Sequence, residues 1–249
     1  MAEEETSLDV LGIKPIADAI STVTKASTDG VGALLARICL PAAEELGLLF
    51  KDKVHAWRGK NAAAIAAAAE ACLALSDDKK NASVHPRIAG AIFDSGSWSD
   101  EDTVQKMWGG LLASACSKDG VDQSNLIFIN FLNQLTPSEV KILEFSCTRT
   151  KFTLSSGGLV ISESELVVDA QRALEISGLH ELDRLDLELD HLRGLGLLGL
   201  TGGFSADRAT PEQATVMPTA DLTSTSLSLQ FYVKCRGFTG TLREFLKLG

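Results

Sequence analysis

The sequence predicts a mainly α (α+β overall) protein: an N-terminal helical domain followed by a C-terminal winged-helix-like domain with a small β wing. Up to about residue 134, apolar residues recur at three- and four-residue spacing, as on the buried faces of amphipathic helices. Beyond it, three helical segments precede two short apolar runs separated by a loop rich in Gly, Ser and Thr, which is the order of a winged helix. We expect an acidic tail at 1–14, a helical domain at 15–134 and a winged-helix-like domain at 135–249.

Short amphipathic helices are predicted to build the helical domain. Pro41 suits the first turn of a helix that runs to Trp57, and the alanine-rich segment 61–75 predicts a separate helix whose small side chains allow close approach of a neighbour. Ser99 and Asp102 have the spacing of a capping box at the start of a helix over 99–116. The other expected helices are 14–26, 30–40, 85–96 and 122–135.

The winged-helix-like domain begins with a strong local signal for a helix. Thr136 as N-cap, Pro137 at the first helical position and Glu139 two residues later predict a helix over 135–147. After a Gly/Ser loop, further helices are expected at 162–177 and 182–192. Wing strands are predicted near 196–200 and 214–220, and the segment 226–235 fits either a strand or a helix.

Charge and cysteine content favour a cytoplasmic protein. With 33 acidic and 23 basic residues the formal charge is -10, which disfavours a general attraction to nucleic acid or anionic lipid. The five cysteines are far apart and lack C-x-x-C spacing, so we expect reduced and mostly buried thiols. The acidic N-terminus does not resemble a secretory signal, and no apolar run reaches the roughly 18–20 residues of a membrane-spanning helix.

No motif in the chain predicts catalysis. The sequence has no phosphate-binding loop, nucleophile elbow or zinc-binding H-E-x-x-H helix, and Glu139 with Lys141 lacks the Pro-Asp partner found in nucleases. The four histidines are scattered, which favours surface or capping roles over metal binding. We therefore expect no catalytic residues, no metal and no cofactor.

The segment 182–198 has the apolar spacing of a DNA recognition helix but the opposite charge. We expect its exposed face to carry Asp183, Asp186, Glu188 and Asp190, and from Ile161 to Asp190 nine acidic residues accompany two arginines. Cations that neutralise phosphates supply much of the affinity for DNA, so this face predicts no specific DNA binding.

A local basic cluster contrasts with the acidic chain. It consists of Lys51, Lys53, Trp57, Arg58 and Lys60. One explanation is a solvated helix end, where cations interact well with the helix dipole. The alternative is a docking patch, because Trp and Arg are common in interface hot spots. We predict that the cluster binds a partner.

Several segments resemble the bacterial abortive-infection alpha family. The resemblance is carried by "LPAAEELGLLFKDKVHAWRGKN", "DEDTVQKMWGGLLASA", "LTPSEVKIL" and "LDHLRGLGLL", and it extends over roughly Ile16 to Gly237. It implies a role in defence against bacteriophage and brings no catalytic residues with it. The N-terminus and the tail "FTGTLREFLKLG" lie outside the matched part.

Together these features predict a non-catalytic defence protein that acts through contacts with a host or phage protein, and homo-oligomer formation is compatible with this function. A first alternative is a membrane-acting effector that uses an amphipathic helix near residues 30–50. A second is a hydrolase whose residues come from distant segments.

Overall fold

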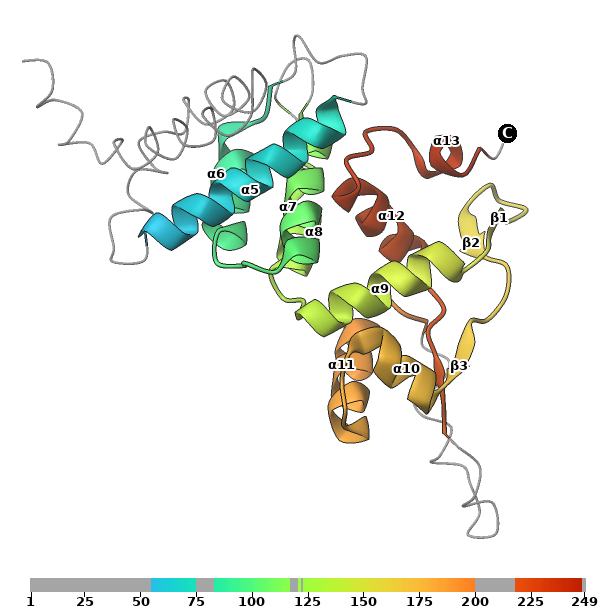
Figure 1. Cartoon of the computed structure of the whole chain (residues 1–249). Coiled ribbons are helices and arrows are strands. Elements are labelled where there is room, and N and C mark those ends of the chain that lie inside the picture. Colours follow the sequence, from blue (N-terminus) through green and yellow to red (C-terminus); the bar gives the residue numbers. More distant parts are fainter. Residues whose placement is uncertain (1–54, 75–82, 117–120, 122, 200–217, 248–249) are drawn as a thin grey trace, which may run out of the picture. The chain divides into compact units, whose positions relative to one another are not determined.

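The computed structural model describes residues 55–74, 83–116, 121, 123–199 and 218–247 (Figure 1). The chain is mainly helical, with short antiparallel strand pairs, as the sequence predicts. It divides into two compact units: Met1–Gln134 with Lys234–Thr239, and Leu135–Val233 with Gly240–Gly249. The predicted second domain included 234–239, which the structure groups with the first unit.

The described part of the first unit contains helices α5 (His55–Leu73), α6 (Pro86–Gly96), α7 (Asp102–Ala115) and α8 (Leu126–Leu132). The helices predicted at 14–26 and 30–40 lie outside the described residues. The predicted separation of a helix ending at Trp57 from one starting at Asn61 is wrong, because α5 runs through both residues. A single Gly59 is tolerated in a segment otherwise rich in strong helix formers.

Helix α7 begins later than predicted. Its N-cap is Glu101, whose carboxylate accepts the backbone N–H of Val104 at 2.8 Å, so the predicted capping box of Ser99 and Asp102 is wrong. The carbonyl oxygen of Ser99 instead accepts the side-chain amide of Gln105 at 2.9 Å. Apolar residues at three- and four-residue spacing form a buried stripe on this helix: Val104, Met107, Trp108, Leu111, Leu112 and Ala115.

Small residues set the close packing of α5 against α7, as the alanine-rich sequence predicts. A Cβ atom placed on Gly109 of α7 would lie 2.8 Å from the carbonyl oxygen of Ile65 and 2.9 Å from the backbone nitrogen of Ala69. Both neighbours are backbone atoms of α5, which cannot turn aside as a flexible side chain does. The two helices therefore contact each other backbone to backbone at this position.

The second unit starts with α9 (Pro137–Arg149), which has the predicted capping box between Thr136 and Glu139. Strands β1 (Phe152–Leu154) and β2 (Val160–Ser162) form an antiparallel hairpin in which Thr153 lies opposite Ile161. The hairpin occupies the place of the predicted Gly/Ser loop. The remaining elements are β3 (Val167–Asp169), α10 (Ala170–Ser177), α11 (Leu182–Gly194), β4 (Thr219–Asp221), α12 (Ser226–Cys235) and α13 (Leu242–Leu246).

The predicted helix over 162–177 is only half correct. Val167–Asp169 forms β3 and pairs antiparallel with β4, and the helix begins at Ala170. The β-branched Val167 and Val168 favour a strand, and Asp169 caps α10 by accepting the N–H of Arg172 at 2.7 Å. Sequence segment 226–235, which fitted either a strand or a helix, is the helix α12.

In the second unit α9 is followed by β1, β2, β3, α10, α11, β4, α12 and α13. Strand β3 pairs with β4, and Leu198, which follows α11, forms an antiparallel bridge with Ser224, which follows β4. The identification of this order as a winged helix stays a prediction. Residues 200–217, which include most of the predicted second wing run, lie outside the described part of the chain.

We expect Gly109→Ala to destabilise the protein by about 2 kcal/mol, because the added methyl group must push α5 and α7 apart. Thermal or urea unfolding of the full chain measures the change. Gly194→Ala in α11 is the matched control, since a Cβ atom there meets nothing within 4 Å. Equal melting temperatures for Gly109→Ala and wild type would contradict the close helix contact.

Candidate functional site

The predicted basic cluster is only partly described by the structure. Lys51 and Lys53 lie outside the described residues, Trp57 is half-buried and Lys60 is exposed. Arg58 differs from the prediction, because it is only 3% exposed. Its charge is therefore not displayed on the surface, and the interpretation of Arg58 as a surface cation is corrected.

Arg58 joins the start of α5 to the end of α6. Its Nε atom donates to the hydroxyl of Ser97 at 3.0 Å, and its Nη2 atom donates to the carbonyl oxygen of Asp94 at 3.2 Å. The same Nη2 atom lies 3.4 Å from a carboxylate oxygen of Asp94, whose side chain is largely exposed. Asn61, one helical turn further, donates to the carbonyl oxygen of Ser97 at 3.0 Å. These bonds make Arg58 part of the fold of the first unit.

Trp98 lies over the buried arginine and pairs with Trp57. The guanidinium carbon of Arg58 lies 4.3 Å from the ring centroid of Trp98, within the range of a cation–π interaction. The rings of Trp57 and Trp98 lie 6.3 Å apart with an interplanar angle of 55°, which is a tilted aromatic pair. Trp98 is still 52% exposed, so an aromatic surface remains next to the buried arginine.

We expect Arg58→Ala to lower the free energy of unfolding by about 3 kcal/mol, because it removes a buried charge-assisted network and leaves Ser97 and Asp94 without that partner. Chemical denaturation measures this loss. Lys60→Ala is the control within the same cluster, and its effect should stay within about 0.5 kcal/mol because Lys60 is exposed. Equally small losses in the free energy of unfolding for both variants would contradict the buried position of Arg58.

The helix that resembles a recognition helix, α11, buries one face and exposes another. Its buried residues are Leu185, Glu188, Leu189, Leu192 and Arg193. On the opposite side, Leu187 is 58% exposed, and Asp183, Asp190 and Gly194 are exposed as well. Glu188 was predicted on the exposed face and is only 2% exposed, so that prediction is wrong.

Glu188 and Glu139 are two buried carboxylates whose hydrogen bonds connect α11 with the start of α9. One Glu188 oxygen accepts Nη2 and Nε of Arg184 at 2.6 and 2.9 Å, and the other accepts the hydroxyl of Thr136. Glu139, 1% exposed, accepts the backbone N–H of Thr136 at 2.7 Å, and its second oxygen lies 2.6 Å from Nδ1 of His191. The capping box of α9 is thus joined to α11 through charged hydrogen bonds.

The basic side chains of α11 contact carboxylates of the same unit. Arg184 binds Glu188, His191 binds Glu139, and Nη1 of Arg193 donates to Asp190 at 3.0 Å. The side chain of Arg193 is 9% exposed, whereas that of Asp190 is 66% exposed, so the acidic partner of this pair faces solvent. The outer face of α11 is therefore acidic and carries an exposed leucine.

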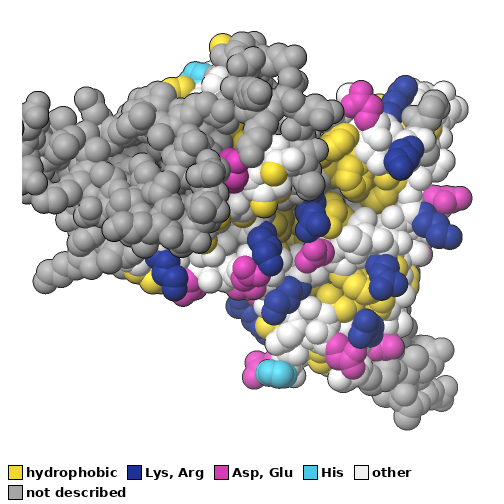
Figure 2. All heavy atoms as spheres, turned by 45° about the horizontal axis from the view of Figure 1, so that its top comes forward, with side chains coloured by type: hydrophobic (Ala, Val, Ile, Leu, Met, Phe, Trp, Pro, Cys, Tyr) yellow, Lys and Arg dark blue, Asp and Glu magenta, His cyan; other side chains and the backbone are white. Residues whose placement is uncertain are grey.

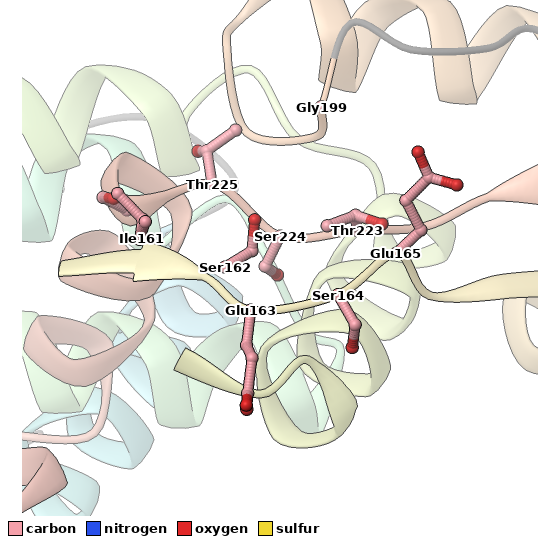
Figure 3. A pocket seen from close by; sticks show the side chains of 10 residues that line it. Ile161, Ser162, Glu163, Ser164, Glu165, Gly199, Thr223, Ser224 and Thr225 are labelled. Atoms are coloured by element: carbon pink, nitrogen blue, oxygen red, sulfur yellow. The ribbon is translucent and has the colours of Figure 1, made fainter. Parts of the chain in front are cut away.

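An open pocket of about 440 Å³ lies beside the hairpin in the second unit. It is lined by Ile161–Glu165 on one side and by Gly199 and Thr223–Ser226 on the other (Figure 3). Its carboxylates, Glu163 and Glu165, point in opposite directions. This arrangement does not bring both groups to one bound atom, so the pocket lacks the geometry of a shared carboxylate pair.

The floor of this pocket is built from hydroxyl groups that hold the fold together. Thr223 accepts the N–H of Leu166 at 2.7 Å, and Thr225 donates to the carbonyl oxygen of Gly196 at 2.7 Å. The hydroxyl of Ser224 lies 2.5 Å from that of Ser146. The sequence does not reveal this pocket, because its walls come from three separate segments of the chain that share no motif.

Cys147 lies behind the pocket among these hydroxyls. Its Sγ atom is 3.2 Å from the hydroxyl of Ser228 and 3.3 Å from that of Ser224. Burial raises the pKa of the Cys147 thiol to about 11, an effect that the two serine hydrogen bonds only partly offset. The thiol is therefore protonated near neutral pH and is a poor nucleophile. The described cysteines are all free: Cys72, Cys116, Cys147 and Cys235.

We expect iodoacetamide to alkylate Cys72 of the folded protein before Cys147 at pH 8. Cys72 is half-buried, and although burial raises its pKa, the charge of Arg236 opposes that increase. Because only the thiolate reacts, the rate at Cys147 should rise about tenfold per pH unit until its pKa is reached. Peptide mass spectrometry follows each site, and denatured protein is the control. Equal rates at both sites in the folded protein would contradict this assignment.

The described residues can be checked for a basic surface, a metal-binding group and a membrane-spanning helix. On the face drawn in Figure 2, lysines and arginines alternate with aspartates and glutamates, and the described residues form no continuous basic surface there. Among the same residues, no group of three or more His, Cys, Asp or Glu side chains is placed to hold a metal ion. No helix in the described ranges combines the length and the apolarity needed to cross a membrane.

The comparison with protein families gives one match. A family model described as abortive infection alpha matches residues 60–225, which is more than half of the chain. The match includes α11, the pocket and most of the first unit's described helices, and it starts after Trp57 and Arg58. No curated protein and no solved structure matches the chain.

Proposed function

Because this chain belongs to the abortive infection alpha family, we propose that it defends bacteria against phage by contacting another protein rather than by catalysis. The family supplies the link to abortive infection. The mode of action is inferred from the side chains of the second unit. We place this action in the cytoplasm, where thiols such as the described free cysteines stay reduced.

The observation that carries the proposal is the outer face of α11. A helix that reads DNA must present cations and amides to phosphates and base edges. In α11 the basic side chains contact Glu188, Glu139 and Asp190 within the unit, and the exposed positions include Asp183 and Leu187. Carboxylates repel phosphates, whereas an apolar side chain between polar groups matches the apolar centre and polar rim of a protein interface.

The predicted contact through Lys51–Lys60 stays part of this proposal in a narrower form. Trp57, Trp98 and Lys60 remain available as an aromatic and basic surface, while Arg58 supports the tryptophans from within. The alternative of a membrane-acting helix near residues 30–50 concerns residues outside the described part of the chain. Flotation with anionic lipid vesicles tests that alternative.

A plaque assay tests the proposed mode of action. In cells that express the protein, Asp183→Asn combined with Leu187→Ala should raise the efficiency of plaquing by at least about tenfold, because it removes the apolar side chain and one carboxylate of the contact face. The melting temperature should change little, since both residues are exposed. The purified wild-type protein should also fail to bind duplex DNA with sub-micromolar affinity at about 150 mM salt.

The matched comparison is a variant of the pocket, Glu163→Gln combined with Glu165→Gln. Its protection should equal that of wild type, because the proposed contact does not use these carboxylates. Full protection by the α11 variant together with lost protection by the pocket variant would overturn the proposal in favour of ligand binding or hydrolysis at the pocket.

A further inference from the structure

We propose that the outer face of α11 binds a cationic amphipathic helix of the partner, an inference that rests on the proposed contact function and identifies its surface and partner class. We define the outer face as Asp183, Leu187, Asp190 and Gly194. All four residues are exposed in the structure. They lie opposite the buried side that holds Leu185, Leu189 and Leu192.

The spacing of the outer face suits a helical partner. Its residues follow one another at steps of four, three and four positions, the spacing that keeps a stripe of side chains facing a second helix. Leu187 lies near the middle of this stripe and is 58% exposed, so it offers an apolar anchor. A Cβ atom at Gly194 would meet nothing within 4 Å, which leaves room for a partner backbone at the end of the helix.

The charges of the outer face determine the sign of the partner. Asp183 and Asp190 flank Leu187 along the stripe, and the side chain of Asp190 remains 66% exposed although it binds Arg193. Arg184 and His191, which lie along one flank, are held by Glu188 and Glu139. Lysine or arginine side chains beside an apolar residue therefore complement this face, because opposite charges across an interface assist encounter and register.

The anionic alternatives fit this face less well. A phosphate backbone or an anionic lipid surface would bring negative charge against Asp183 and Asp190, and the neighbouring Arg184, whose side chain is 48% exposed, is already paired with Glu188. A cationic helix also differs from a purely apolar one, which would leave both carboxylates against apolar surface. The charge complementarity thus selects a basic amphipathic partner.

Fluorescence anisotropy with a defined peptide tests this proposal on the full-length protein. The probe is a labelled synthetic helix of leucine and lysine, and the comparison peptide replaces each lysine by glutamate. The leucine–lysine peptide should bind more tightly than the leucine–glutamate peptide, and its affinity should fall as salt rises. Leu187→Ala should raise its Kd about tenfold, and Asp183→Asn should raise the Kd about threefold and weaken the salt dependence.

Two matched variants control for general attraction to an acidic protein. Ile127 on α8 is 58% exposed, the same fraction as Leu187, and Asp100 is an exposed aspartate of the first unit. Ile127→Ala and Asp100→Asn should leave the Kd unchanged. Equal weakening by these controls, or equal binding of the two peptides, would overturn the docking surface.

The plaque assay separates this inference from the proposed function. If Leu187→Ala loses peptide binding but still protects fully against phage, the docking surface is supported and its use in defence is rejected. Loss of protection with unchanged peptide binding would reject the cationic helix as the partner. A change in the sedimentation of the protein alone in Leu187→Ala would identify a second copy of the chain as the occupant and overturn the assignment to another protein.

Discussion

Two buried carboxylates in the second unit need partners, and this requirement determines which charged side chains α11 leaves exposed. Glu139 and Glu188 are almost fully buried, and an ionised carboxylate that has lost its water needs charged or hydrogen-bonding partners. Thr136 supplies a backbone N–H and a hydroxyl from the start of α9, and Arg184 and His191 supply charged or polar nitrogen atoms from α11. The basic side chains of α11 thus pair with carboxylates of the same unit and help to stabilise its fold.

The first unit also buries a charged side chain, that of Arg58. Arg58 lies under Trp98 and donates to Ser97 and to the backbone of Asp94, so it fixes the connection that follows α6. The close contact of α5 with α7 at Gly109 depends on backbone approach in addition to side-chain packing. We therefore expect substitutions of Arg58 and Gly109 to destabilise this unit, although the sequence alone suggests that Arg58 is an exposed cation.

The abortive infection alpha family supplies the link to phage defence, and the side chains of the second unit are the basis of the proposed mode of action. The matched residues include α11, whose outer face has an exposed leucine between carboxylates. They also include the pocket beside the hairpin, whose floor hydroxyls are engaged in bonds that hold the unit together. From these two observations we propose a contact helix on a firmly bonded support.

The sequence by itself determined the helical class, the capped start of α9 at Thr136 and the buried stripe of α7, because periodicity and capping depend on residues within a few turns. It did not predict the hairpin of three-residue strands, which is too short for an alternating pattern to identify. Only the tertiary structure decided that Arg58 and Glu188 are buried. Their partners Ser97 and Thr136 lie 39 and 52 residues away, and the destination of a charged side chain depends on such distant partners, which local sequence does not specify.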